Sequence, residues 1–162
     1  MIALALMPLM LMAQAKIAVV NSQELFNLLP EKATAEAQLK ALSDKYHAEY
    51  ELLRGEFDKK YADYQTVAAD ASMPETIKDR RIQELQESDK KMREFERRAA
   101  DDIAAQREAL TQPITDKIQA AIRTAGAQGG YDLVLDTAVT PVAYTGPNTT
   151  DITPMVKTLL GL

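Results

Sequence analysis

Between residues 31 and 69, apolar and aromatic side chains recur at helical spacing. Successive positions are three or four residues apart, in an order that repeats every eleven residues: Leu39, Leu42, Tyr46, Tyr50, Leu53, Phe57, Tyr61, Tyr64 and Ala68. An eleven-residue repeat averages 3.67 residues per turn, which keeps the stripe on one face of a nearly straight helix. The segment contains no proline and one glycine, Gly55. The pattern therefore predicts a single helix about 60 Å long, which is too long for a compact domain.

The helical pattern breaks at residues 70–75, the sequence DASMPE. Ser72 and Glu75 have the spacing of a capping box, and Pro74 is well tolerated in a first helical turn, so a new helix should start here. Two long helices joined by a short break are best explained as an antiparallel coiled-coil hairpin. We expect residues 31–125 to form this helical arm, with its tip near residues 70–75.

The second helix should run from about residue 75 to residue 125. Its apolar stripe comprises Ile82, Leu85, Met92, Phe95, Ala99, Ile103, Leu110, Ile114, Ile118, Ile122 and Ala125. Pro113 lies inside this helix, removes one backbone hydrogen bond and should kink it one turn earlier. The glycines that follow should end it: Gly126, Gly129 and Gly130.

Both ends of the chain have the composition of short strands. Residues 16–21 (KIAVVN), 131–136 (YDLVLD) and 139–145 (VTPVAYT) are rich in β-branched or apolar side chains, and Pro141 suits an edge strand. A lone N-terminal strand must find partners for its backbone N–H and C=O groups. Because a hairpin returns the chain to its origin, we expect a three-stranded sheet built from both ends.

Short helices should flank these strands. Asn21 and Glu24 have capping-box spacing, and Asp151 should cap a last helix near the C-terminus. The predicted β body comprises residues 16–30 and 126–162. The fold class is thus mainly α with a small β body, from which the long helical hairpin projects.

The first fifteen residues contain no charged side chain and are almost all apolar. They end in Ala13-Gln14-Ala15, the small-x-small pattern that signal peptidases recognise. A membrane anchor is the alternative, but a spanning helix needs about 20 apolar residues. We therefore expect residues 1–15 to be a signal peptide that is cleaved after Ala15, so that the mature chain begins at Lys16 in the periplasm.

The composition limits both stabilisation and partners. The chain has no cysteine for disulfides, and its net charge of −5 provides no general attraction to nucleic acid or to an anionic membrane. Four glutamate–base pairs have a favourable spacing for a helix standing free in water: Glu36/Lys40, Glu56/Lys60, Glu87/Lys91 and Glu94/Arg98. The small sheet has little to bury against in one chain, so we expect copies to associate through Ile17, Val19, Leu133, Leu135, Val142 and Tyr144.

These segments, in this order, resemble the Skp/OmpH family of periplasmic chaperones. The resemblance covers essentially the whole mature chain and rests on KIAVVN with its short helix, Pro30-Glu31-Lys32-Ala33, YDLVLD, Val142-Ala143-Tyr144 and Asp151-Ile152-Thr153. It implies a homotrimer with a shared β body, whose three arms enclose a cavity that holds unfolded outer-membrane proteins without ATP. Members of the family are often basic. The first helix here carries 6 basic and 8 acidic residues, so contact with lipopolysaccharide or membrane is not expected.

The arm carries the candidate residues for contact with an unfolded client: Tyr46, Tyr50, Phe57, Tyr61 and Tyr64. A tyrosine combines an apolar ring with a polar tip, which suits adaptable contacts. The alternative is that these rings form the seam between the two helices, where an apolar stripe at helical spacing usually lies. Both roles can hold, because two helices cannot cover every large side chain.

No residues of the sequence point to an enzyme. His47 is the only histidine, cysteine is absent, and no calcium-loop spacing occurs, so we predict no catalytic, metal-binding or cofactor-binding residues. The glycines of residues 126–130 follow a helix and precede a strand, the reverse of the order in a phosphate-binding loop. A structural or adaptor coiled coil of the cell envelope is the competing function. It explains the hairpin but not why both chain ends form a β body.

Overall fold

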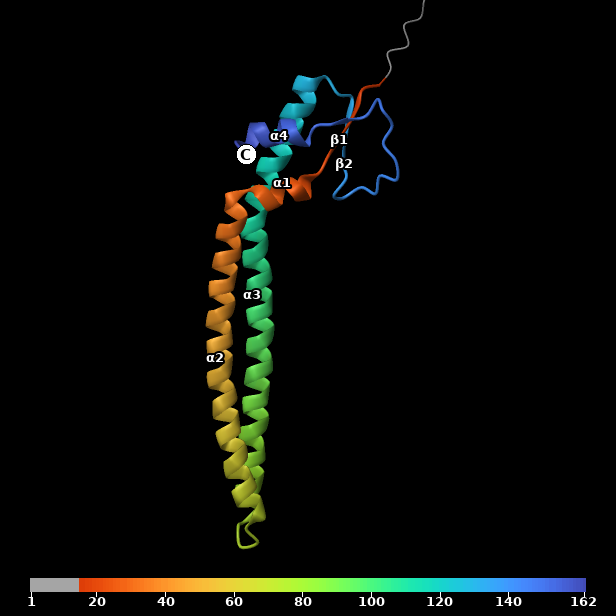
Figure 1. Cartoon of the computed structure of the whole chain (residues 1–162). Coiled ribbons are helices and arrows are strands. Elements are labelled where there is room, and N and C mark those ends of the chain that lie inside the picture. Colours follow the sequence, from red (N-terminus) through yellow and green to blue (C-terminus); the bar gives the residue numbers. More distant parts are fainter. Residues whose placement is uncertain (1–14) are drawn as a thin grey trace, which may run out of the picture. The chain divides into compact units, whose positions relative to one another are not determined.

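The computed structural model describes residues 15–162, so the predicted signal peptide lies, apart from Ala15, outside the described residues. Helices predominate (Figure 1). None of the helices in the described part is both long and apolar enough to cross a membrane. The elements, in chain order, are β1 (Ile17–Val20), α1 (Ser22–Leu28), α2 (Pro30–Ala69), α3 (Glu75–Gly129), β2 (Leu133–Asp136), β3 (Thr150–Asp151) and α4 (Thr153–Leu160).

The chain forms two compact units, and α3 contributes to both. The hairpin unit is Pro30–Pro113. The sheet unit combines the described residues up to Leu29 with Ile114–Leu162. Each unit has its own buried side chains, so each is described by itself below.

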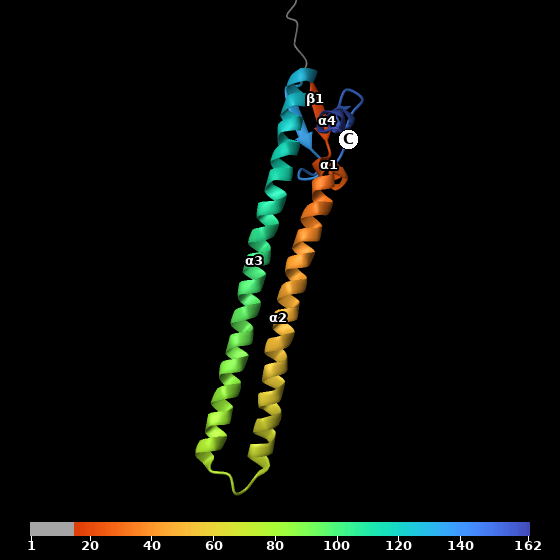
Figure 2. The same cartoon turned by 90° about the vertical axis from the view of Figure 1, so that its left-hand side faces the viewer.

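The hairpin unit consists of two long antiparallel helices that lie side by side in both views (Figures 1 and 2). Tyr46, in the first half of α2, contacts Asp102 of α3, whereas Lys60, further along α2, contacts the earlier Ser88. Partners thus move back along α3 as α2 advances, which is the order of an antiparallel pair. The predicted hairpin and its two helices are confirmed.

The turn between the helices is built around Asp70. Its carboxylate accepts hydrogen bonds from the backbone N–H of Ser72 at 2.8 Å and from the Ser72 hydroxyl at 2.6 Å. The Ser72 hydroxyl therefore donates to Asp70, although the predicted capping box gave it a role at the start of α3. The helix nevertheless begins at Glu75, as the sequence predicted.

The C-terminal end of α3 lies further along the chain than predicted. Gly126 does not stop the helix, because it lies inside it, where a Cβ atom would come within 3.3 Å of a Val134 methyl group. The helix ends in a Schellman motif: Tyr131 N–H donates to Gly126 O, Gly130 N–H donates to Ala127 O, and Gly130 has φ +62°. Gly126 therefore serves close packing between helix and strand, and Gly130 provides the left-handed turn.

The sheet unit contains a parallel sheet of order β2-β1-β3. The N-terminal strand is central, and both of its partners come from the far end of the chain, as predicted. Ile17 pairs with Leu133 and Val19 with Leu135 on one side. On the other side, Ile152 N–H donates to Val19 O at 2.9 Å, next to β3.

The predicted third strand at residues 139–145 is wrong; the third strand is the two-residue β3. The backbone N–H groups of Val139 and Thr140 both donate to Asp136 O, and Ala138 N–H donates to the Asp136 carboxylate. This turn directs the chain away from the sheet immediately after β2. Residues 139–145 therefore form a loop despite their strand-like composition.

One face of the sheet forms the core of the sheet unit. Ala18 and Val20 are fully buried there, and the remaining buried apolar side chains include Leu25, Leu29, Ile114, Ile118, Ile122, Ala125, Ile152 and Val156. The two short helices are joined by an ion pair of 2.5 Å between Glu24 of α1 and Lys157 of α4. The predicted cap of α1 forms, since Asn21 Oδ1 accepts from Glu24 N–H. The N-cap of α4 is Ile152 and not Asp151, although the Asp151 carboxylate accepts from Thr153 N–H.

Candidate functional site

The aromatic series on α2 divides into two groups. Tyr46 belongs to the seam of the hairpin unit: its ring meets the edge of Phe95 at a centroid distance of 5.8 Å, and its hydroxyl donates to the Asp102 carboxylate at 2.7 Å. The hydrogen bond to Asp102 raises the pKa of Tyr46. A hydrogen bond to the Glu96 carboxylate raises the pKa of Tyr50 in the same way. These two tyrosines therefore join α2 to α3.

Further along α2, Phe57 and Tyr61 stack on each other within the same helix. Their rings are nearly parallel, 8° apart, with centroids separated by 6.3 Å. Tyr61 is 46% exposed, and Tyr64 and Phe57 are half-buried. This part of the series is partly exposed, whereas Tyr46 and Tyr50 lie in the seam. Contact of these rings with a client stays a prediction.

A shallow groove of about 320 Å³ lies on the hairpin unit around the seam aromatics. It is lined by side chains of both helices: Ser43, Tyr46, His47, Tyr50, Phe95, Glu96, Ala99, Ala100 and Ile103. Phe95 also lines a second hollow of about 150 Å³ with Leu53 and Arg98. The seam is therefore incompletely covered, and an extended apolar segment could reach the Phe95 ring from either hollow.

The basic side chains near the turn of the hairpin are paired with neighbouring carboxylates. Arg80 and Arg81 both bind Glu84, at 3.1 and 2.7 Å, and Lys78 binds Glu75 at 3.0 Å. The hydrogen bond from Arg81 also lowers the pKa of Glu84. These pairings leave little unbalanced positive charge to attract an anionic partner.

Of the predicted glutamate–base pairs, Glu94–Arg98 forms, at 3.2 Å. Two of the predicted bases instead contact the opposite helix of the hairpin, because a partner on that helix lies within reach of each. Lys60 donates to the buried Ser88 hydroxyl at 2.6 Å, and Lys91 lies 4.0 Å from Glu56. Sequence spacing within one helix does not reveal such partners.

The second candidate surface is the open face of the sheet. The register places Ile17 beside Leu133 and Val19 beside Leu135, and side chains that pair in this way share a face. Ile17, Val19 and Leu135 are half-buried, and Leu133 is 47% exposed. Four of the six predicted oligomer-interface residues thus form one contiguous apolar face, opposite the buried face of Ala18 and Val20.

The other two predicted interface residues lie in the loop between β2 and β3. Val142 is half-buried, whereas Tyr144 is 81% exposed, and Val139 in the same loop is also exposed. The error in the third strand explains this difference. The structure does not bring these two side chains onto the sheet face with the other four.

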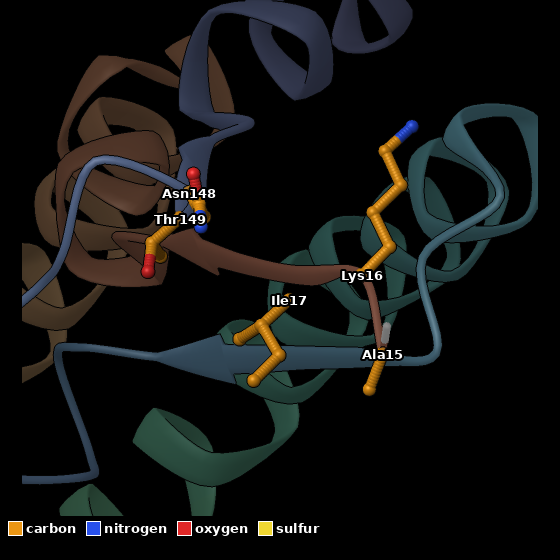
Figure 3. A pocket seen from close by; sticks show the side chains of 5 residues that line it. All are labelled: Ala15, Lys16, Ile17, Asn148 and Thr149. Atoms are coloured by element: carbon orange, nitrogen blue, oxygen red, sulfur yellow. The ribbon is translucent and has the colours of Figure 1, made fainter. Parts of the chain in front are cut away.

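A hollow of about 530 Å³ lies at the N-terminal end of β1, lined by Ala15, Lys16, Ile17, Asn148 and Thr149 (Figure 3). Beside it, the Lys16 ammonium donates to Gly129 O at 2.6 Å and lies 4.4 Å from the centre of the Tyr131 ring. The sequence pattern does not predict these contacts. The only available signal was the position of Lys16 next to the predicted cleavage site.

No group of three or more histidine, aspartate or glutamate side chains within residues 15–162 is arranged to hold a metal ion. The surfaces described above consist of aromatic and aliphatic side chains with paired charges at their borders. Such surfaces suit binding and assembly.

Comparison with known proteins agrees with this architecture. The sequence profile of the family described as outer membrane protein (OmpH-like) matches residues 16–160. The crystal structure of a candidate outer membrane chaperone (OmpH-like) from Caulobacter crescentus CB15 superposes with a TM-score of 0.70, covering 91% of this chain and 85% of that one. The two sequences are 15% identical, so the superposition supports the fold. No curated protein matches the sequence significantly.

Proposed function

Because the chain belongs to the OmpH-like family of outer membrane proteins, we propose that it is an ATP-independent holdase chaperone of the periplasm. It binds unfolded outer-membrane proteins, prevents their aggregation and releases them without catalysis. It acts as a homotrimer, with the clients held in a cavity between three hairpin units. The signal peptide of residues 1–15 directs it to the periplasm and is removed after Ala15.

Exposed apolar side chains along the hairpin unit are the observation that carries this proposal. Leu52 is 65% exposed and Tyr61 46%, and Ile77 and Ile82 are also exposed. An unfolded outer-membrane strand alternates apolar with polar side chains. Scattered apolar positions bordered by charge provide weak, adaptable contacts for such a chain, and no single rigid pocket is required.

The open sheet face supports self-association. An exposed apolar face and a free strand edge are costly for an isolated chain, and association between copies covers both. The free edges here are those of β2 and β3, since β1 is paired on both sides. The apolar face of Ile17, Val19, Leu133 and Leu135 accordingly forms the interface within the trimer.

A shortened hairpin tests the function. Deleting residues 59–69 and 76–86 removes eleven residues, about three helical turns, from each helix and keeps the turn at residues 70–75. The variant should keep its oligomeric state in native mass spectrometry but protect a urea-unfolded outer-membrane barrel poorly when the barrel is diluted. Light scattering reports the aggregation.

The competing function, an adaptor coiled coil of the envelope, gives a different result. An adaptor would leave the barrel to aggregate whether the hairpin is full-length or shortened, and neither form would capture it in native mass spectra. A control variant is Leu159→Ser, which removes a leucine that is 42% exposed on the sheet unit and should leave protection unchanged.

A further inference from the structure

Lys16 is held at both of its nitrogen atoms by residues 129–132, at the C-terminal end of α3 and just beyond it. Its backbone N–H donates to the Asp132 carboxylate at 2.7 Å, and its ammonium donates to Gly129 O at 2.6 Å. Asp132 N–H in turn donates to Lys16 O at 2.9 Å. We call Gly129, Tyr131 and Asp132 the Lys16 cradle.

The cradle is a consequence of how α3 ends. The Schellman motif satisfies the carbonyls of Gly126 and Ala127, which leaves later carbonyls of the helix without a backbone partner of this kind. The Lys16 ammonium binds one of them, Gly129 O, at the negative end of the helix dipole. The Tyr131 ring lies 4.4 Å from the same ammonium and adds a cation–π contact.

Gly129 is needed for this arrangement. A Cβ atom at this position would lie 2.2 Å from Cε2 of Tyr131, so a side chain here would push the ring from its place. The ring, the carbonyl and the carboxylate are thus arranged together around one residue. That residue is Lys16, which would be the first residue of the mature chain after cleavage at Ala15.

We propose that the Lys16 cradle is a binding site for the new amino terminus that signal-peptide cleavage creates. Hydrolysis breaks the bond between the Ala15 carbonyl carbon and the Lys16 nitrogen. The hydroxyl of water goes to the Ala15 carbonyl, and the released Lys16 amine takes up a proton at neutral pH. The resulting α-ammonium forms an ion pair with the Asp132 carboxylate, while the ε-ammonium stays on Gly129 O.

Cleavage thereby strengthens the hold on the central strand. Before cleavage, the Lys16 nitrogen is an amide with one hydrogen and no charge. Afterwards it is a cation with three hydrogens, so a hydrogen bond in which only the Asp132 carboxylate is charged becomes an ion pair between two charged groups. The Asp132 carboxylate contacts the Lys16 backbone nitrogen, and the Tyr131 ring lies 4.4 Å from the ε-ammonium of the same residue. Processing therefore fixes β1 in its register between β2 and β3.

Hydrogen exchange at the β1 amides tests the proposal. The mature chain is released from a fusion partner so that it begins at Lys16, and the matched control begins at Ala13, which restores the amide and displaces the charge by three residues. Both are also made with Asp132→Asn, which keeps the shape and an acceptor oxygen. The β1 amides should exchange about 1.5- to 5-fold more slowly in the chain that begins at Lys16, the range of an exposed ion pair.

This difference should disappear with Asp132→Asn. It should also disappear above about pH 9, because an α-amino group ordinarily titrates near pH 8 and a neutral amine forms no ion pair. Equal exchange in the two chains that retain Asp132, or a difference that survives Asp132→Asn, would overturn the proposal.

The inference rests on the processing step of the proposed function, and the two can fail separately. The intact mass of protein recovered from the periplasm should correspond to a chain that starts at Lys16. Any other start overturns the cradle as a terminus site and says nothing against client holding. Loss of barrel protection overturns the holdase function and leaves the exchange difference in place.

Discussion

Replacing Leu133 with glutamate should dissociate the proposed trimer without unfolding the sheet unit. Leu133 lies at the first position of β2, beside Ile17 on the open face, and is 47% exposed in the single chain. Because the side chain makes few contacts within its own chain, a polar replacement should cost the isolated fold little. Its main effect falls on the surface that a second copy would cover.

The magnitude follows from the exposed fraction. Full burial of a leucine contributes about 1.5–3 kcal/mol, so a side chain that is half exposed has about 1 kcal/mol still to gain when a neighbour covers it. Three copies would contribute about 3 kcal/mol per trimer, or roughly 150-fold in the assembly constant. A buried, unpaired glutamate adds several kcal/mol of desolvation at each copy, which makes assembly negligible at micromolar concentration.

Sedimentation velocity over a dilution series measures this change, and far-UV circular dichroism reports whether the helices persist. Leu159→Glu is the matched control, because Leu159 is 42% exposed on α4 of the same unit but lies off the sheet face. Equal dissociation of the two variants, or unchanged assembly of Leu133→Glu, would refute the assignment of the open face to self-association.

Further predictions concern two glycines and two tyrosines. Gly55→Ala should stabilise the chain by about 0.5–1 kcal/mol, because Gly55 lies inside α2 with no heavy atom within 4 Å of an added Cβ. Gly129→Ala should instead destabilise it by about 1 kcal/mol or more, since the added Cβ would collide with the Tyr131 ring, and urea unfolding of both variants checks the opposite signs. Tyr46 should ionise above its ordinary pKa of 10.0 in a phenolate absorbance titration, and Asp102→Asn should move that pKa back down. Because folding raises the pKa of Tyr46 and of Tyr50, their contribution to stability is complete below about pH 10 and is lost as the pH rises through the folded-state values. A flat unfolding midpoint from pH 9 to pH 11.5 would contradict this.

The hairpin could be predicted because its determinants are local. The eleven-residue stripe of α2, the break at residues 70–75 and the long stripe of α3 are all properties of neighbouring residues. The structure places the helices within a few residues of the predicted bounds. The pairing of β1 with strands from the far end of the chain was also predictable, because its backbone groups needed partners and only that end could supply them.

The third strand could not be predicted in the same way, because its position depends on tertiary contacts. Residues 139–145 have better strand composition than Thr150–Asp151, yet hydrogen bonds to the backbone and carboxylate of Asp136 turn the chain away after β2. The second edge of β1 pairs instead with β3, next to which Ile152 N–H donates to Val19 O. A parallel strand needs a long connection, so the loop uses the residues that composition had assigned to a strand.

Seam partners show the same limit within the hairpin unit. Spacing predicted that Lys60 would pair with Glu56, but Lys60 reaches Ser88 of α3, and Glu56 lies near Lys91. Which residues of two antiparallel helices meet depends on the exact length of the turn between them. The sequence pattern shows which face of each helix is apolar, and the length of the turn then determines which residues of the two helices lie opposite each other.

The position of β1 connects processing, folding and assembly in the proposed function. Its side chains alternate: Ala18 and Val20 enter the core, whereas Ile17 and Val19 face outward with Leu133 and Leu135. A strand that slipped by one residue would exchange these two sets, burying the interface and exposing the core. Fixing Lys16 at the first position therefore does more than hold an end. It selects the register in which Ile17 and Val19 face outward with Leu133 and Leu135. The free amino terminus at Lys16 therefore favours the form of the sheet that can assemble.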